Sequence, residues 1–85
     1  MASYSVLIKR SATSELADLP LRDRRRVVAR IGGLAAGPRP AGCEKLSGEE
    51  KYRIRHGDLR ILYEIDDRDA TVTIVKIGHR RDVYR

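Results

Sequence analysis

The spacing of hydrophobic residues changes about halfway along this chain. In the first half, apolar residues recur every three or four positions, as they do on one face of an α-helix. From residue 51 onward, apolar residues alternate with charged ones, which is typical of strands that bury one face. The pattern therefore predicts helices first and a run of short strands afterwards.

The first half begins with a β-branched and apolar run, Tyr4 to Lys9, which predicts a strand. A helix is expected next, with one apolar stripe formed by Ala12, Leu16 and Leu19, and Pro20 is expected to end it or to begin the following helix. A second helix is predicted from about Leu21 to Ala36. Its apolar stripe consists of Val27, Val28, Ile31, Leu34 and Ala35, and five arginines take other positions.

Three alternating runs make up the second half, at residues 51–55, 59–65 and 70–77. Two short turns join them, so they predict an antiparallel meander. The order is β-α-α-β-β-β. The predicted fold class is α+β, with two N-terminal helices packed on one face of a curved antiparallel sheet of about four strands, in one domain over residues 1–85.

The composition adds an excess of positive charge. Charged residues make up 35% of the chain, and 18 Lys and Arg stand against 12 Asp and Glu, for a net charge of +6. Fourteen of those 18 cations are Arg. Such an excess attracts polyanions, nucleic acid above all, although a solvated basic surface has the same composition.

Few cysteines and histidines are present. One Cys, Cys43, makes no internal disulfide, and two His lack the spacing of a zinc site. No glycine-rich phosphate loop follows a strand, and no apolar run approaches a membrane span. We therefore expect a cytoplasmic protein with no metal, no cofactor and no membrane contact.

The alternation places basic side chains together on the predicted sheet. Arg53 and Arg55 share one strand face, and Arg60 joins them if the neighbouring strand buries Leu59 and Ile61. Guanidinium groups bind phosphate oxygens in a bidentate manner, so the three could form a phosphate site. The alternative is that carboxylates pair with them across the strands. The candidate carboxylates are Glu64, Asp58 and Glu49 or Glu50.

Four motifs in order resemble the RelE/ParE superfamily, the toxins of type II toxin–antitoxin modules. They are Lys45-Leu46-Ser47-Gly48, Tyr52-Arg53-Ile54-Arg55, Gly57-Asp58-Leu59-Arg60-Ile61-Leu62-Tyr63 and Gly78-His79-Arg80-Arg81-Asp82-Val83-Tyr84. The resemblance covers the whole chain. It implies a RelE-like microbial ribonuclease fold and a ribosome-dependent mRNA endoribonuclease, an mRNA interferase that cuts the codon in the ribosomal A site and so inhibits translation. The attacking group would be the 2′-hydroxyl of the RNA, without a metal.

The resemblance also implies roles for particular residues. The basic cluster of the family corresponds to Arg53, Arg55, Arg60 and Arg80, and its functional tyrosine corresponds to Tyr84. RelE-type toxins commonly carry Lys at the first two positions, and an arginine cannot act as a proton shuttle. We therefore expect Arg53 and Arg55 to bind RNA, Arg60 and Arg80 to stabilise the phosphorane, and Tyr84 to act as the base, with His79 as the alternative. The remaining candidates for RNA binding are Lys45, Lys51 and Arg81.

The expected partners also follow from the resemblance. They are a short acidic antitoxin, the ribosome with its mRNA, and promoter DNA only through the antitoxin complex. Two other functions stay open. One is a ParE-like toxin that inhibits DNA gyrase, and the other is a catalytically inactive relative that only binds an antitoxin.

Overall fold

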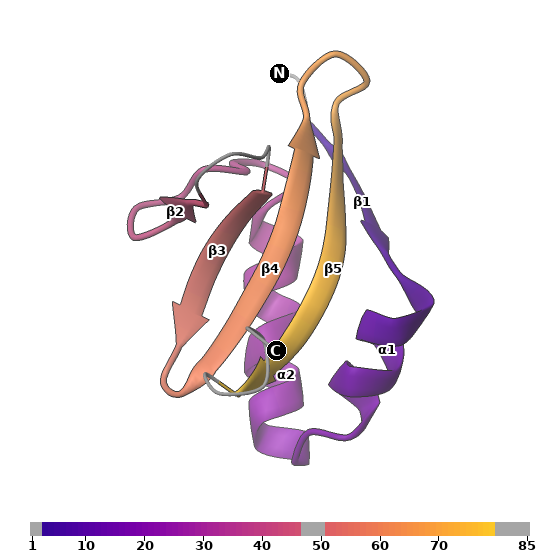
Figure 1. Ribbon diagram of the computed structural model, residues 1–85, viewed down its shortest axis with the longest axis vertical. Helices are drawn as coiled ribbons and strands as arrows, with labels where there is room; N and C mark the ends of the chain where they lie inside the picture. The colour runs from indigo at the N-terminus through magenta and orange to yellow at the C-terminus, as the bar shows by residue number, and fades with distance from the viewer. Residues whose placement is uncertain (1–2, 47–50, 80–85) are drawn as a thin grey trace.

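The computed structural model describes residues 3–46 and 51–79, and its secondary structure confirms the predicted α+β class (Figure 1). Two helices follow the first strand, and the remaining strands follow the helices. The elements are β1 (Ser5–Ile8), α1 (Arg10–Ala17), α2 (Leu21–Gly33), β2 (Glu44–Lys45), β3 (Lys51–His56), β4 (Leu59–Asp66) and β5 (Thr71–His79).

The sheet is mixed and has five strands in the order β1-β5-β4-β3-β2. Strands β3, β4 and β5 form the predicted antiparallel meander. Two features differ from the predicted antiparallel sheet of about four strands. Strand β1 pairs in parallel with β5, from Ser5 opposite Thr71 to Ile8 opposite Ile74, and the two-residue strand β2 lies along β3. Hydrophobic spacing marks which segments are strands but does not say which distant strands will pair.

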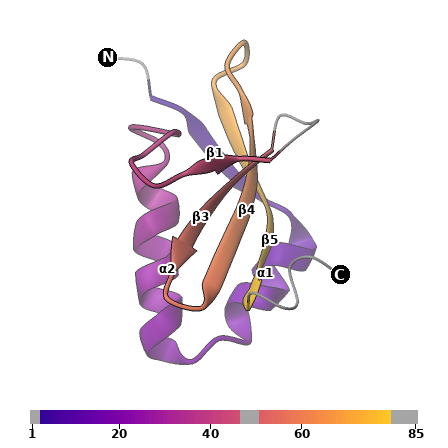
Figure 2. The ribbon, with the colours of Figure 1, turned by 60° about the vertical axis from the view of Figure 1, so that its left-hand side comes forward.

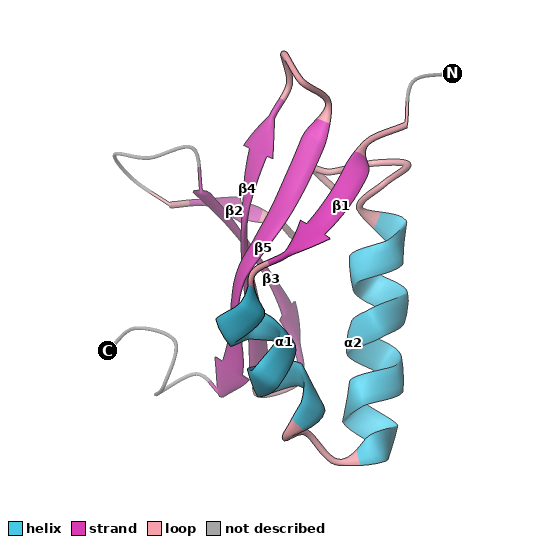
Figure 3. Ribbon diagram, turned by 90° about the vertical axis from the view of Figure 1, so that its right-hand side faces the viewer, coloured by secondary structure: helices cyan, strands magenta, loops and turns pink. Residues whose placement is uncertain are grey.

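Both helices cover the same face of the sheet, and α2 runs along most of its length (Figure 2). The side view shows the two layers separately, with β2 on the far side from the helices (Figure 3). Apolar side chains fill the space between the layers, and Tyr63 is the largest of those that are fully buried. The core is formed by Ala12, Leu19, Val27, Ile31, Leu34, Tyr52, Ile54, Leu59, Ile61, Tyr63, Ile65, Val72, Ile74 and Ile77.

The helices are shorter than predicted. Helix α1 ends at Ala17, before Leu19, and α2 ends at Gly33, three residues before Ala36. Val28, which the predicted stripe included, is 51% exposed, because a helix that packs on a sheet buries only a narrow strip of its surface. None of the described helices is long and apolar enough to cross a membrane.

A β-bulge interrupts the pairing of β4 with β5. The register moves by one residue between Leu62, which pairs with Lys76, and Tyr63, which pairs with Ile74. A carboxylate oxygen of Glu15 on α1 accepts a hydrogen bond from the Ile77 backbone N–H at 3.1 Å. This bond joins β5 to helix α1 just beyond the bulge, and the bulge changes which β5 side chains point away from the helices.

Candidate nucleic-acid interface

The face of the sheet without helices carries the arginines that the sequence singled out. Arg55 lies directly opposite Arg60, and Arg53 lies directly opposite Leu62. Residues that pair across two strands point to the same side, so the three guanidinium groups share this face. Their neighbours Ile54 and Ile61 point the other way and are fully buried under the helices. The alternation of β3 and β4 thus separates an apolar side from a basic one.

Glu44 on β2 contacts this cluster from within the described part of the chain. It forms an ion pair with Arg53, and its Oε1 lies 3.3 Å from the Nη2 of Arg55. The sequence pointed to Glu64, Asp58 and Glu49 or Glu50, and Glu44 was not among these candidates. Glu64 pairs with Lys51 in the register, and Asp58 is exposed in the β3–β4 turn, while Glu49 and Glu50 lie outside the described residues. Strand β2 has only two residues, too few to show an alternation. The sequence pattern therefore did not indicate that Glu44 would contact the arginines.

Arg60 is buried, with 7% of its surface exposed. Its Nη1 donates hydrogen bonds to the Gly57 carbonyl at 2.9 Å and to the Leu59 carbonyl at 3.0 Å. Gly57 adopts a positive φ of 59°, which brings the β3–β4 turn close enough to accept the first bond. Backbone carbonyls fix the direction of the guanidinium, and they leave its positive charge in place.

Three lysines near the cluster lie in different places. Lys51 is on the same face as Arg53, two residues before it, whereas Lys45 pairs with Tyr52 and lies at the edge of the sheet. Lys76, which the sequence did not single out, pairs with Leu62 and is half-buried in the same row as Arg53. The β5 bulge changes the alternation, and for this reason the sequence pattern did not reveal Lys76.

Of the two candidate bases, only His79 lies within the described residues. His79 ends β5 and pairs with Leu59, so it lies on the helix side of the sheet, whereas its neighbour Gly78 pairs with Arg60. The other predicted residues of the C-terminal motif are outside the described residues. They are Arg80, Arg81 and Tyr84.

The other three tyrosines hold the fold together through their hydroxyls. Tyr63 donates to the Pro38 carbonyl at 2.8 Å, and its burial raises the pKa of the phenol. Tyr52 stacks on Tyr63 with a ring-centroid distance of 5.8 Å and accepts a hydrogen bond from Arg39. Tyr4 donates to Asp67 at 2.7 Å, and this bond raises its pKa. Each of these hydroxyls already has a structural partner.

Arg39 and Asp67 form a second arginine–carboxylate contact, at the other end of the sheet. Two guanidinium nitrogens of Arg39 donate to the two carboxylate oxygens, at 3.2 and 2.8 Å. The Arg39 guanidinium also lies 5.1 Å from the centre of the Tyr52 ring. The hydrogen bonds from Arg39 lower the pKa of Asp67. We call this contact the Arg39–Asp67 clasp, and it joins the loop after α2 to the β4–β5 turn.

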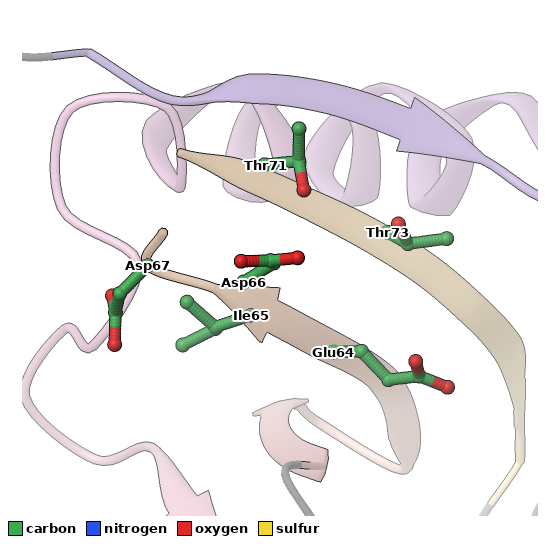
Figure 4. Close-up of a pocket in the computed structure, with 6 residues that line it drawn as sticks. All are labelled: Glu64, Ile65, Asp66, Asp67, Thr71 and Thr73. Carbon is green, nitrogen blue, oxygen red and sulfur yellow. The ribbon is translucent and has the colours of Figure 1, made fainter. Parts of the chain in front are cut away.

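An open pocket of about 480 Å³ lies at the same end, between β4 and β5 (Figure 4). It is lined by Glu64, Ile65, Asp66, Asp67, Thr71 and Thr73. No group of three or more metal-ligating side chains occurs in the described part of the chain. Asp66 is six residues from Arg60 along β4, or about 20 Å. The face of the sheet is therefore basic at one end and acidic at the other, and an anion will favour the basic end.

Sequence comparison places this arrangement in a known class of toxins. The family described as "ParE toxin of type II toxin-antitoxin system, parDE" matches residues 6–84. The chain is also 36% identical to toxin RelG of Mycobacterium tuberculosis over 86 residues, which span 96% of this chain and 97% of RelG. The chain therefore belongs to the RelE/ParE superfamily of type II toxin–antitoxin toxins.

Solved structures show the same fold. The RelBE2 toxin–antitoxin complex of M. tuberculosis matches with a TM-score of 0.80 and 33% identity, over 92% of this chain and 99% of that one. The archaeal RelE–RelB complex from Pyrococcus horikoshii OT3 matches with a TM-score of 0.83 and 29% identity, over 94% and 98% of the two chains. The isolated E. coli RelE toxin shares the fold at 23% identity, with a TM-score of 0.80 over 96% and 92%.

Proposed function

We propose that this toxin is a ribosome-dependent mRNA endoribonuclease that cuts A-site mRNA without a metal. The observation that carries the proposal is the group of three guanidiniums, Arg53, Arg55 and Arg60, on the face of the sheet that no described helix covers. A single RNA strand laid across this face would meet Arg55, which is exposed, whereas Arg53 is half-buried and Arg60 is buried, so these two would act on it as fixed positive charges. The acidic pocket beyond Glu64 would repel the strand, which restricts the bound phosphates to the basic end.

The proposed reaction needs only groups of the RNA and of the protein. The 2′-oxygen forms a bond to the adjacent phosphorus while its proton passes to a base, and the bond to the 5′-oxygen breaks as that oxygen receives a proton. The products are a 2′,3′-cyclic phosphate and a 5′-hydroxyl. Negative charge develops on the phosphorane, and fixed cations stabilise it because they need no reorganisation during the reaction. The two carbonyl bonds of Arg60 provide such fixation.

Tyr84 is our choice for the base. The hydroxyls of Tyr4, Tyr52 and Tyr63 all have structural partners, and His79 lies on the opposite side of β5 from the position that faces Arg60. Removing a general base typically lowers a rate by 10²–10⁴-fold. Tyr84→Phe should therefore slow cleavage by at least about 10²-fold, and His79→Gln should leave it within a few-fold of the wild type. The opposite ranking would make His79 the base.

The ends of the cleaved RNA test the reaction directly. Ribosomes programmed with a defined mRNA should yield fragments with a 2′,3′-cyclic phosphate and a 5′-hydroxyl. An mRNA with a single 2′-deoxyribose before the cut site should be bound and left intact, because its nucleophile is missing. Fragments with a 5′-phosphate would instead indicate attack by water and would overturn the proposal.

The runner-up function is inhibition of DNA gyrase, and one finding favours it: the family model that matches residues 6–84 carries the ParE name. The two functions differ in what they stop first. Induction of an mRNA nuclease should stop incorporation of amino acids within minutes without DNA damage signalling. Induction of a gyrase inhibitor should cause supercoiling loss and DNA damage signalling while translation continues. A catalytically inactive relative would do neither.

The partner proposed for this toxin is a short acidic antitoxin. Two similar structures, from M. tuberculosis and P. horikoshii, are complexes of such a toxin with its antitoxin. The net charge of +6 supports an acidic partner, because association of opposite charges is fast and selective. Co-expression with the neighbouring reading frame should yield one stable complex, and this complex rather than the toxin alone should bind the promoter of the operon. The proposed site of action is the cytoplasm.

A further inference from the structure

The proposed reaction needs a proton donor as well as a base. The 5′-oxygen leaves as an alcohol, so a group of the protein must protonate it while its bond to phosphorus breaks. The guanidiniums of Arg53, Arg55 and Arg60 stay protonated and cannot supply this proton. Tyr84, the proposed base, takes up a proton in the same step. The donor is therefore a further side chain near the basic end of the sheet.

Lys76 on β5 lies beside the arginines of the basic face. Strands β3, β4 and β5 run side by side (Figure 1), and Leu62 on β4 pairs with Lys76 on one side and with Arg53 on the other. In the next row, Gly78 pairs with Arg60 and has no side chain. Diagonal neighbours on adjacent strands are about 7–8 Å apart, a distance that a lysine side chain spans, so Lys76 can contact a phosphate held near Arg60.

The β-bulge determines that Lys76 faces away from the helices. With strict alternation from Ile74, which is buried under the helices, residue 76 would also be buried and Ile77 would face outward. The register shift between Leu62 and Tyr63 reverses this order, so Ile77 is buried and Lys76 points to the basic face. Bulges often lie next to active sites, where they redirect a side chain. Here the redirected side chain is a lysine.

Lys76 carries a charge that no described carboxylate balances. The carboxylate of Glu44 contacts Arg53, whereas none of the described carboxylates contacts Lys76. The lysine is half-buried beside Leu62, which is 8% exposed although no described helix covers it. Lysine stems cover apolar surface in this way and leave the ammonium group at the solvent. A cation in this position is available to an external anion.

The other lysines near the cluster and both histidines lie elsewhere. Lys51 pairs with Glu64, which lines the acidic pocket, and Lys45 lies at the edge of the sheet. His56 and His79 lie on the helix side of their strands. Among these groups of the described chain, only Lys76 combines a transferable proton with a place between the arginines.

We infer that Lys76 is the acid that protonates the leaving 5′-oxygen. The inference rests on the proposed function, since it assigns a group to the same reaction. As the bond between phosphorus and the 5′-oxygen breaks, the Nζ of Lys76 gives one proton to that oxygen and becomes a neutral amine. The amine regains a proton from water after the product leaves. On this face the arginines hold the charge of the phosphorane, and the lysine moves the proton.

Two substitutions separate proton transfer from charge. Lys76→Arg keeps the positive charge without a transferable proton, and Lys76→Gln loses both. Loss of a general acid typically costs 10²–10⁴-fold in rate, so both variants should cut ribosome-bound mRNA at least about 10²-fold more slowly. Lys76→Arg should still bind mRNA with a 2′-deoxyribose at the cut site as the wild type does. Wild-type cleavage by Lys76→Arg would show that only charge matters here and would overturn the inference.

A sulfur leaving group tests the proton transfer itself. An mRNA in which sulfur replaces the 5′-oxygen at the cut site releases a thiolate, which needs no acid because thiols ionise near about pH 8.5. This substrate should restore cleavage by Lys76→Gln to within a few-fold of the wild type. Arg60→Ala should show no such recovery, because its phosphorane still lacks a cation. Failure of sulfur to rescue Lys76→Gln, or equal rescue of both variants, would refute the assignment.

Lys9→Gln is the matched control. Lys9 is exposed and next to β5, where its backbone N–H donates to the Ile74 carbonyl, but it lies outside the basic cluster. Its replacement should leave cleavage within a few-fold of the wild type, and thermal melts show whether each variant is folded. If the wild type cuts ribosome-bound mRNA and the Lys76 variants cut equally well, only the inference fails. If the wild type cuts no mRNA, the proposed function fails with it.

Discussion

Two arginine–carboxylate contacts lie at opposite ends of one sheet, and their surroundings differ. In the Arg39–Asp67 clasp, one guanidinium meets one carboxylate through two hydrogen bonds, and two tyrosine hydroxyls complete the contact. At the basic end, the Glu44 carboxylate contacts two guanidiniums, and Arg60 is held by neutral carbonyls. The clasp pairs one arginine with one carboxylate, whereas the basic end brings three arginines together within two neighbouring strands. We infer that the isolated pair serves the fold and that the gathered arginines serve an external anion.

Arg60→Ala should have the largest effect on activity. Loss of one fixed cation at a developing oxyanion typically costs about 10²–10³-fold in rate. We expect cleavage of ribosome-bound mRNA to fall by that factor and growth arrest to disappear. Because Arg60 is also buried, Arg60→Lys serves as a second variant, which restores a cation without both carbonyl bonds and should recover part of the rate. Wild-type cleavage in Arg60→Ala would contradict the proposed role.

Arg80→Ala, in the C-terminal motif, should also lower the rate of cleavage. Its loss should also reduce cleavage by about 10²–10³-fold if Arg80 stabilises the phosphorane. Folding and antitoxin binding should not change, which circular dichroism and co-purification can check. If Arg60→Ala and Arg80→Ala both arrest growth as the wild type does, the mechanism is wrong.

Glu44→Gln should act in the opposite direction. In the free toxin the Glu44 carboxylate contacts Arg53 and Arg55, where RNA phosphates would bind, so the two anions compete. Removing the charge should strengthen binding of the uncleavable mRNA by roughly 3–10-fold, the range expected for a partly exposed ion pair. Asp67→Asn is the matched control, since it removes the carboxylate of the other contact. Equal or weaker binding by Glu44→Gln would mean that Glu44 orients the arginines rather than competing with RNA.

Arg39→Ala should affect stability and spare activity. It removes the stacking on Tyr52 and the contact with the β4–β5 turn. A loss of about 1 kcal/mol lowers the melting temperature of a domain of this size by roughly 4–8 °C. Cleavage measured well below that temperature should match the wild type. A loss of cleavage comparable to that of Arg60→Ala would contradict a purely structural role for the Arg39–Asp67 clasp.

The pH dependence of stability should show the smallest effect. Asp67 has a lowered pKa in the folded protein, so its contribution is fully present above the ordinary pKa of an aspartate and is lost as the pH falls through the lower folded value. The difference in melting temperature between wild type and Asp67→Asn should be constant near neutral pH. It should shrink below about pH 4. A constant difference down to pH 2 would show that the charge of Asp67 does not matter.

The sequence predicted local features better than long-range ones. Alternation in β3 and β4 was sufficient to place Arg53, Arg55 and Arg60 on one face, because side chains of a regular strand must alternate. Alternation failed where a strand was too short or irregular. Glu44 lies in a two-residue strand, and Lys76 follows a bulge that shifts the pattern. The clasp was also not predicted, because Arg39 and Asp67 are 28 residues apart and meet only when the loop and the turn are folded.

The parallel pairing of β1 with β5 has a consequence for synthesis of the toxin. In space β5 lies between β1 and β4, yet along the chain it is the last of the three to be made. Until β5 leaves the exit tunnel, β1 has no strand to pair with and β4 lacks one of its two neighbours. The basic face therefore cannot reach its final form on a nascent chain, because its scaffold is completed by the last strand. A chain that has not yet added β5 therefore cannot present the finished basic face.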